Sequence, residues 1–479
     1  MTELNLPLLT TNDDIVNRAF RIALGDLSGN IALFKDGLLS RPQPCILAGL
    51  DYNTPWTRDT AINTWNGAGL LFPQAALNTQ LSVLERVKDK VRISGQYWDA
   101  IIWTTGAWHH YLYTGDRKFL AIALKATSNS LTHFEETEFN PRLNLFRGPA
   151  CYGDGVSAYP DVYAQTGNSS DILDWPQHNP DKKAGTGFGI PMHALSTNAL
   201  YFNAYRLATL MAVELGVKPN AGWESKASRL KVSINRHFWN PKKDCYRYIV
   251  DTFGGCDHNE GLGHSFALMF GISNARQTAA VLKNQHITPQ GIPCVWPSYS
   301  RYTNGKGDHF GRHSGTVWPH VQGFWAVAAA ENKRPNLFEH EIFSLAGLAG
   351  RDNQFTEIYH PKTGAIYGGM QESQQGMRLW NSCARQTWSA TAYLRMVLMG
   401  LCGMRFEPKG IRFAPTLPER IGQVRLESLA YRKMSLNVEI EGTGTRVKEF
   451  KVNNRPVSSG FLNADGRGEK TVSVKLHSR

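Results

Sequence analysis

The spacing of apolar residues changes near Cys402, and this change constrains the fold more than any other feature of the sequence. Before it, apolar residues recur every three or four positions, the period of an amphipathic helix. One such stripe comprises Leu200, Ala204, Leu207, Met211 and Leu215, and Gly216 follows as a candidate helix end. Beyond Arg405 apolar and polar residues alternate, as in 424–429 and 436–440. We therefore predict a mainly α domain over residues 1–402 and a small antiparallel, β-sandwich-like module over residues 403–479.

Further helical patterns precede the change. They lie at 13–26, 59–85, 99–113, 117–134, 223–238, 263–270, 274–284, 318–331, 336–350 and 385–401. Counted this way, the chain has roughly a dozen helices, near the number that an (α/α)6 toroid needs. Three connecting segments are unusually long, at 139–195, 286–317 and 351–384, and they are rich in Trp, Tyr, Gly, Asp and His. Because long loops in a compact domain are usually functional or disordered, we predict that these form a functional cup at one end of the toroid.

The charge of the chain argues against a nucleic-acid-binding protein. The 52 Lys and Arg residues against 40 Asp and Glu residues give a net charge of +12, but basic clusters such as 86–92 are interrupted by acidic and apolar residues. Such clusters are typical of a solvated surface rather than of a nucleic-acid footprint. We therefore expect no nucleic-acid partner, although the positive charge would favour an anionic substrate.

Cysteine usage and hydropathy bear on the compartment. The seven cysteines are odd in number and form no C-x-x-C pair, which argues against a disulfide framework or a zinc knuckle. Residues 1–20 contain acidic side chains and no apolar run typical of a signal peptide, and no stretch is long enough to span a membrane. The sequence predicts a soluble, cytoplasmic protein with no membrane partner, unless a signal has been removed, and it leaves the oligomeric state open.

The segment Tyr52-Asn53-Thr54-Pro55-Trp56-Thr57-Arg58-Asp59 places an aromatic plate beside an Arg–Asp pair at a predicted helix start. A sugar offers an apolar ring face and several hydroxyls, so a Trp face with charged groups beside it suits sugar binding. Trp56, Arg58 and Asp59 are therefore candidate binding residues. A helix-start Asp with a surface Arg remains the alternative.

Two loops carry candidate catalytic carboxylates. The Gly-rich, aromatic segment 148–161 contains Asp154, with Asp161 close enough to compete, and aromatic neighbours are expected to raise the pKa of such an acid. Residues 355–364 contain Glu357, with Glu372 as its rival. Two carboxylates on opposite loops of one cup are what glycoside hydrolysis requires, one to protonate the leaving oxygen and one to act on water or carbon. A turn-forming Asp and a solvated Glu are the alternatives.

No pattern indicates a cofactor. His258, His264, His309 and His313 have no metal-binding spacing, and no phosphate-binding loop, Rossmann glycine pattern or nucleophile elbow is present. We therefore expect no cofactor and no metal site, although the absence of a D-x-[DN]-x-[DN]-G loop leaves a calcium requirement open.

Several motifs occur together in an order that resembles a known group of enzymes. They are Trp56-Thr57-Arg58-Asp59-Thr60-Ala61, Tyr97-Trp98-Asp99, Ser196-Thr197-Asn198-Ala199, Arg312-His313-Ser314-Gly315-Thr316-Val317-Trp318-Pro319, Glu357-Ile358-Tyr359-His360-Pro361-Lys362-Thr363-Gly364 and Trp388-Ser389-Ala390. Over about residues 45–400, this order is similar to that of the six-hairpin glycosidases. The nearest resemblance is to glycoside hydrolase family 63 and its relatives, the mannosylglycerate hydrolases and trehalases.

The resemblance implies roles for individual residues. It implies that Asp154 is the general acid and Glu357 the general base, although the family writes Ser-Gly-x-Asp where this chain has Tyr152-Gly153-Asp154. Trp56, Arg58 and Asp59 resemble the floor of the subsite for the cleaved sugar, and Arg312 and Trp318 resemble its far wall. Trp98 and Asp99 occupy the place of a family pair beside the acid. For Trp318 and Trp388 a packing role is the alternative.

The function implied by the resemblance is an inverting, exo-acting glycoside hydrolase for an α-linked sugar of the glucoside or mannoside type, with an oligosaccharide or glycoside as substrate. A glycoside phosphorylase, a polysaccharide lyase and a non-catalytic sugar-binding protein are the alternatives. The segment 412–418 resembles the small β module of phosphorylases and rhamnosidases, whereas the Glu357 motif counts against a phosphorylase or a lyase. The sugar, its linkage and the aglycone are left open.

Overall fold

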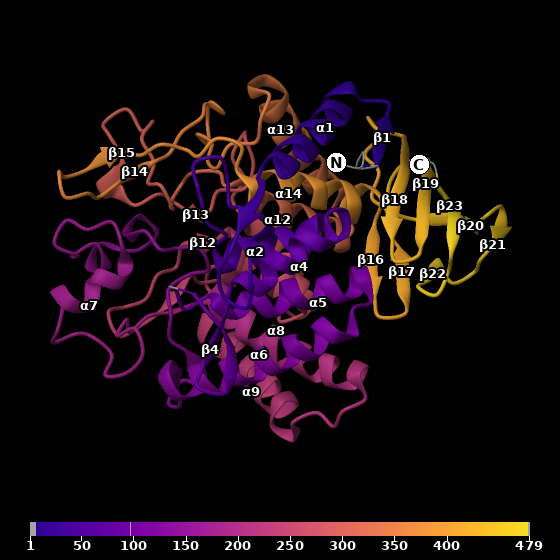
Figure 1. Cartoon of the computed structure of the whole chain (residues 1–479). Helices are drawn as coiled ribbons and strands as arrows, with labels where there is room; N and C mark the ends of the chain where they lie inside the picture. The colour runs from indigo at the N-terminus through magenta and orange to yellow at the C-terminus, as the bar shows by residue number, and fades with distance from the viewer. Residues whose placement is uncertain (1–5, 96, 478–479) are drawn as a thin grey trace.

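The computed structural model describes residues 6–95 and 97–477. Its helical part occupies most of the chain, and the C-terminal strands gather at one side of it (Figure 1). The helices are α1 (Asp14–Gly29), α2 (Thr57–Asn63), α3 (Gly69–Leu71), α4 (Pro73–Ser82), α5 (Trp103–Thr114), α6 (Arg117–Thr137), α7 (Trp175–His178), α8 (Leu195–Leu215), α9 (Ala221–Phe238), α10 (Gly261–Met269), α11 (Ala275–Asn284), α12 (Pro319–Glu331), α13 (Pro335–Asp352) and α14 (Thr387–Arg395). The helix-to-strand change predicted near Cys402 is therefore confirmed.

Local sequence signals account for several helix ends. Asp13 caps α1 by accepting hydrogen bonds from two backbone N–H groups, and Asp116 does the same for α6. Gly216 ends α8 with a φ of 73°, as predicted from its position after the apolar stripe. The prediction of one helix over 59–85 is wrong, because Gly67 has a φ of 122° within a π-helical turn and Pro73 starts a new helix.

The long helices pack in a continuous sequence. Each member of the series α2, α5, α8, α10, α12 and α14 packs against the next, and α14 returns to pack against α2. The helices α6, α9 and α13 lie against this series, α6 and α9 on α8 and α13 on α12. Short strands connect the helices: β2 (Ile31–Phe34), β3 (Gln43–Ile46), β4 (Leu84–Val87), β5 (Lys90–Ile93), β6 (Phe139–Asn140), β7 (Leu145–Phe146), β8 (His193–Ala194), β9 (Trp239–Asn240), β10 (Cys245–Tyr246), β11 (Ile249–Val250), β12 (Asn259–Glu260), β13 (Val295–Trp296), β14 (Met370–Gln371) and β15 (Arg378–Leu379).

The C-terminal region is a two-sheet β module. Its strands are β16 (Met404–Glu407), β17 (Gly410–Phe413), β18 (Gln423–Tyr431), β19 (Met434–Glu441), β20 (Val447–Val452), β21 (Arg455–Pro456), β22 (Phe461–Asn463) and β23 (Gly468–Leu476). The larger sheet has the order β1-β18-β19-β23-β20-β21, and the smaller has the order β16-β17-β22. Two details correct the prediction. The N-terminal strand β1 (Leu8–Thr11) belongs to this sheet, and β19 and β23 are parallel, so the module is mixed rather than antiparallel.

The β module and the helices share apolar core. One buried cluster joins Leu9 of β1 and Val424 of β18 to Val16 of α1 and Tyr393 of α14. All seven cysteines are buried and unpaired. Within the described residues, no helix is both long and apolar enough to cross a membrane, and no group of three or more His, Cys, Asp or Glu side chains is arranged to hold a metal ion.

Glu341 of α13 anchors the loop at 286–317. It is fully buried, and its carboxylate accepts hydrogen bonds from the backbone N–H of Ile292 at 3.0 Å and from Gln322 Nε2 at 3.0 Å. Burial raises the pKa of Glu341 from 4.5 to about 8, against the lowering effect of these hydrogen bonds. The folded state therefore holds this proton to a higher pH than the unfolded chain does.

This shift predicts a pH-dependent stability. The stabilisation from protonated Glu341 is complete below about pH 4.5 and is lost as the pH rises through about 8. We expect the Tm to fall between pH 6 and pH 9, and the fall to be smaller in Glu341→Gln, which cannot ionise. Thermal unfolding of both proteins across this range measures the difference, and parallel curves would contradict the assignment.

Candidate active site

A cavity of about 660 Å³ opens where several helices begin and the long loops meet. Its walls come from the α2 start, from all three long segments identified in the sequence and from the α12 and α14 starts. The lining residues are Asp51, Tyr52, Trp56, Arg58, Asp59, Tyr97, Tyr152, Asp154, Gly155, Ser170, Asp171, Arg312, His313, Trp318, Glu357, Gln371, Arg378, Leu379, Trp380, Asn381, Cys383, Gln386 and Trp388. Thus Asp154, Glu357, Trp56, Arg58, Asp59, Arg312 and Trp318, distant in sequence, face one cavity.

Asp154 is held at the wall of the cavity by a strained turn. Tyr152, two residues before it, has a φ of 57°, a left-handed conformation that is rare for an aromatic residue. The backbone N–H of Asp154 donates to the carbonyl oxygen of Tyr152 at 2.9 Å. Gly155, next in the chain, has no room for a side chain, because a Cβ there would overlap Gln371 Oε1 and lie 2.7 Å from the His313 ring. The turn therefore fixes the direction in which the carboxyl group points.

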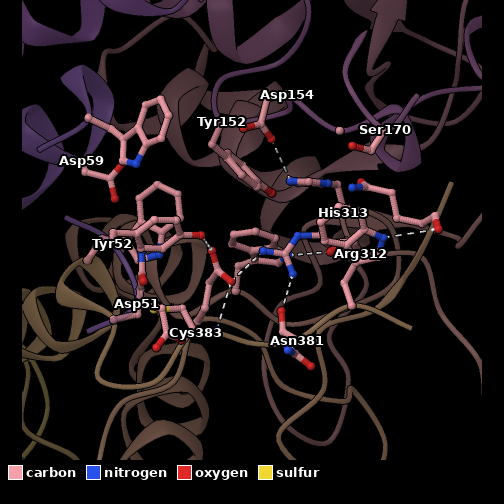
Figure 2. A pocket seen from close by; sticks show the side chains of 18 of the residues that line it. Asp51, Tyr52, Asp59, Tyr152, Asp154, Ser170, Arg312, His313, Asn381 and Cys383 are labelled. Carbon is pink, nitrogen blue, oxygen red and sulfur yellow. Dashed lines mark hydrogen bonds and ion pairs between the residues drawn. The ribbon is translucent and has the colours of Figure 1, made fainter. Parts of the chain in front are cut away.

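Two cationic or ionisable side chains contact the Asp154 carboxyl group. Arg58 Nη2 donates to Oδ2 at 2.8 Å, and His313 Nε2 lies 3.4 Å from Oδ1. Figure 2 shows Asp154 facing His313. Burial raises the pKa of Asp154, but Arg58 and His313 outweigh it and hold the pKa well below its usual range. The expectation of a raised pKa is therefore wrong, because it considered the aromatic neighbours and not Arg58.

Glu357 is almost fully buried and is held by three donors. Arg312 Nη2 donates to Oε2 at 2.7 Å, the Cys383 backbone N–H donates to the same oxygen at 3.3 Å, and the Tyr52 hydroxyl donates to Oε1 at 3.1 Å. The Glu357 N–H donates to the Cys383 carbonyl at 2.9 Å, so the residue is also held through its backbone. Since a carboxylate oxygen has two acceptor positions, Oε1 retains one for a further donor such as water.

Arg312 connects the base candidate to the loops around it. Besides Glu357, its guanidinium donates to the carbonyl oxygen of Gly368 at 3.0 Å. It also donates to the carbonyl oxygen of Asn381 at 2.9 Å (Figure 2). Trp318 Nε1 donates to the Arg312 carbonyl at 2.8 Å, and the guanidinium carbon lies 5.4 Å from the centre of the Trp318 ring. Arg312 and Trp318 thus form one rigid unit of the wall, and Trp318 both packs and lines the cavity.

Asp59 is a third carboxyl group in the cavity. It is buried, and burial raises its pKa to about 8, with Arg58 opposing this effect and Glu357 and Asp154 adding to it. The raised pKa favours the protonated form of Asp59 at neutral pH, which can both donate and accept hydrogen bonds. Arg58 lies 4.4 Å from the Tyr97 ring centre and 6.0 Å from that of Trp56, so aromatic faces flank its charge.

The rival carboxylates lie outside the cavity lining. Arg301 binds both of them, with Nη1 donating to Asp161 at 2.7 Å and Nε donating to Glu372 at 3.1 Å. The Asp161 side chain is 75% exposed, and Glu372 also accepts hydrogen bonds from the Tyr302 hydroxyl. The structure therefore favours Asp154 and Glu357 over Asp161 and Glu372.

Because Asp161 is exposed and outside the cavity, Asp161→Asn should change kcat by less than about twofold, as for a surface charge away from the reacting groups. Steady-state kinetics on any cleaved glycoside tests this. A loss comparable to that of Asp154→Asn would return Asp161 to the role of acid.

Trp98 and Asp99 do not reach the cavity, which corrects their assignment as substrate-binding residues. Trp98 is fully buried, and its Nε1 donates to the carbonyl oxygen of Ala150 at 3.1 Å. Asp99 Oδ2 accepts from the backbone N–H of Tyr152 at 2.8 Å. Both residues support the strained turn that carries Asp154 from behind. Both residues follow Tyr97, which lines the cavity, and nothing in the sequence indicated that their own side chains point away from it.

The structure adds residues that motif reasoning missed. Ser157 Oγ lies 3.0 Å from His313 Nδ1 and donates to Gln371 Oε1 at 2.8 Å, so a chain of polar contacts runs from Asp154 through His313 and Ser157 to Gln371. Arg378 and Trp380 form part of the cavity wall, with the guanidinium carbon 4.4 Å from the Trp380 ring centre. These residues belong to the long polar and aromatic loops, and the composition of those loops was the only sequence feature that pointed to them.

Two parts of the chain match known glycoside hydrolase families. Residues 99–389, more than half of the chain, match the model of the mannosylglycerate hydrolase MGH1-like glycoside hydrolase domain. Residues 404–457 match the C-terminal domain of glycosyl hydrolase family 65. A search of curated protein sequences finds no match.

Solved structures share the fold. A sialidase matches 98% of this chain and 40% of its own, with 14% identity and a TM-score of 0.65. The GH78 rhamnosidase of Bacillus sp. GL1 matches 99% of this chain and 44% of its own, with 14% identity and a TM-score of 0.56. The GH63 mannosylglycerate hydrolase of Thermus thermophilus, in complex with glucose, matches 79% of this chain and 99% of its own, with 14% identity and a TM-score of 0.59. The chain thus spans less than half the length of the sialidase and the rhamnosidase.

Proposed function

The chain belongs to the mannosylglycerate hydrolase MGH1-like glycoside hydrolases, and from this membership we propose that it removes a terminal α-linked sugar, of the glucoside or mannoside type, with inversion. The observation that carries the proposal is that Asp154 and Glu357 face one cavity, each bound to its own arginine. A cavity of this kind, rather than a long groove, suits removal of a sugar from a chain end. Trp56 and Asp59 are proposed to hold that sugar, together with Arg58.

The proposed scaffold is an (α/α)6 toroid formed by residues 1–402, with residues 403–479 as a separate module. The successive packing of α2, α5, α8, α10, α12 and α14, with α14 returning to α2, supports a closed inner ring. Further support comes from the cavity position at the start of α2, α12 and α14. The pairing of β1 with β18 adds the N-terminal strand to the module.

In the proposed mechanism Asp154 protonates the leaving oxygen. Arg58 and His313 favour its ionised form. A sugar that fills the cavity displaces water from the carboxylate, and desolvation favours the protonated form. His313 Nε2, 3.4 Å from Oδ1, is positioned to exchange a proton with this carboxyl group.

Glu357 then acts as the base. Its Oε1 has an acceptor position left for the attacking water, while Arg312 and the Cys383 N–H hold Oε2 in place. An inverting mechanism requires the two carboxyl groups to lie about 6.5–9.5 Å apart, with water between Glu357 and the sugar. A phosphorylase would need no such base, so the three hydrogen bonds that fix Glu357 favour hydrolysis.

The experiment that tests the proposal is a panel of aryl α-glycosides and α-linked disaccharides incubated with the full chain. Release of a single terminal sugar type would support an exo-acting glycosidase and identify the sugar. Binding of sugars without turnover, with the wild-type fold intact, would favour the sugar-binding alternative. Cleavage that depends on added phosphate would favour the phosphorylase.

A further inference from the structure

A second cavity, of about 210 Å³, lies at the other end of the same helices. Trp318 and Trp388, at the start of α12 and α14, line the catalytic cavity, whereas Glu331 and Arg395, the last residues of these helices, line the second. Most other side chains around the second cavity are aromatic, apolar or sulfur-containing, including Trp65, Trp108, Phe270, Met399 and Phe406. A charged group in this setting is poorly solvated.

Arg395 is such a group. Only 2% of it is exposed, and its guanidinium carbon lies 4.6 Å from the ring centres of both Trp65 and Phe324. Its hydrogen-bonding partners are weak, with Asn66 Oδ1 at 3.3 Å and Met269 Sδ at 3.9 Å. Among the residues described, Nε has no partner and no carboxylate forms an ion pair with Arg395. Arg58 and Arg312, by contrast, each bind a carboxylate within 2.8 Å.

Among the described residues around the cavity, Glu331 favours the charged form of Arg395 from a distance but forms no ion pair with it. Glu331 is paired with Arg405, whose Nε lies 3.1 Å from its carboxylate. Burial lowers the pKa of His109 to about 3, so this residue is neutral. Burial also lowers the pKa of Arg395, but only to about 10, so the guanidinium remains charged at neutral pH. The side chains that line the cavity thus contribute two guanidinium groups and one carboxylate.

We propose that this second cavity binds a small monoanion, the size of a halide or a short carboxylate, against the guanidinium of Arg395. A buried cation without a counter-ion is costly, and an anion beside Arg395 would supply the acceptors that Asn66 and Met269 supply only weakly. The apolar walls favour an ion with a single charge over phosphate or sulfate, which lose more hydration on entering such a site. The proposal is independent of the catalytic assignment.

The test is a titration of the full chain with chloride, acetate and phosphate, at an ionic strength held constant with a bulky sulfonate buffer. Tryptophan fluorescence includes the signals of Trp65 and Trp108 among those of 13 tryptophans, and thermal unfolding reports on binding to the folded state. We expect a saturable change with chloride or acetate, the more effective of the two identifying the class of ion. No saturable change with either, or a preference for phosphate, would overturn the proposal.

Arg395→Met tests the guanidinium itself, because methionine retains an apolar side chain that can fill part of the space. The variant should weaken anion binding by about tenfold or more, as for loss of a charge-assisted hydrogen bond. Arg425→Met is the matched control, since it removes one positive charge from the β module, where Arg425 is 54% exposed. It should bind as the wild type does. An equal anion-dependent rise in Tm in all three proteins would show that the effect arises elsewhere.

A second measurement does not depend on the variant folding. Crystals of the wild-type chain soaked in bromide should show an anomalous difference peak within hydrogen-bonding distance of the Arg395 guanidinium. Peaks confined to the surface would contradict the proposal.

Discussion

Replacing Glu357 with Gln is expected to slow the hydrolysis of every substrate strongly, whatever its leaving group. Water must be deprotonated in each case, and the Gln amide cannot accept that proton. The loss of kcat should be about 10²–10⁴-fold, the usual contribution of one general base. Activated aryl glycosides and natural disaccharides should be depressed alike when kcat is measured for both.

The control for this variant must separate chemistry from folding. The neutral amide of Glu357→Gln would leave Arg312 buried without a carboxylate, which is itself destabilising. Thermal unfolding and sugar binding should therefore be measured beside kcat, and Glu372→Gln offers the same substitution outside the cavity lining. A Glu357→Gln variant that is folded and retains kcat within about tenfold of the wild type would remove Glu357 from the mechanism.

Asp154→Asn is expected to discriminate between substrates. Loss of the acid matters most when the leaving group is poor, so cleavage of a natural disaccharide should fall by about 10²–10⁴-fold. An activated aryl or fluoride leaving group needs less protonation and should be partly spared. The measurement is kcat for wild type and variant on both kinds of substrate.

The matched control is Asp161→Asn, the same substitution seven residues along the chain, at an exposed residue outside the cavity lining. Equal losses on both substrate types in Asp154→Asn would deny Asp154 the role of acid. Asp154→Asn also removes the ion-pair partner of Arg58, but this effect is the same for both substrate types. A difference in kcat loss between the two types therefore reports on the acid role alone.

The spacing of apolar residues predicted a helix well where that helix is continuous, and less well where the backbone breaks the helix. The stripe ending before Gly216 corresponds to α8. The pattern over 59–85 concealed the break at Gly67, where φ is 122° and a Cβ would lie 3.0 Å from Leu398. The strand β1 escaped notice because it is four residues long and is defined by its pairing with β18, more than 400 residues away. Pairing at such a distance leaves no local pattern.

In the candidate site, too, local motifs were predictive and contacts between distant residues were not. The motifs brought Asp154, Glu357, Arg58 and Arg312 into consideration, and the structure places all four around one cavity. The direction of the Asp154 pKa shift was missed, because Arg58 comes from a different element 96 residues earlier. Electrostatic partners that are remote in sequence cannot be read from a motif.

The central claim is inversion by Asp154 and Glu357, and the configuration of the first product tests it most directly. Proton NMR of an α-glycoside digest, recorded before mutarotation, should show the β-anomer of the released sugar as the first product, because water attacks from the face opposite the leaving group. The α-anomer as first product would mean retention through a covalent intermediate, and would contradict the account.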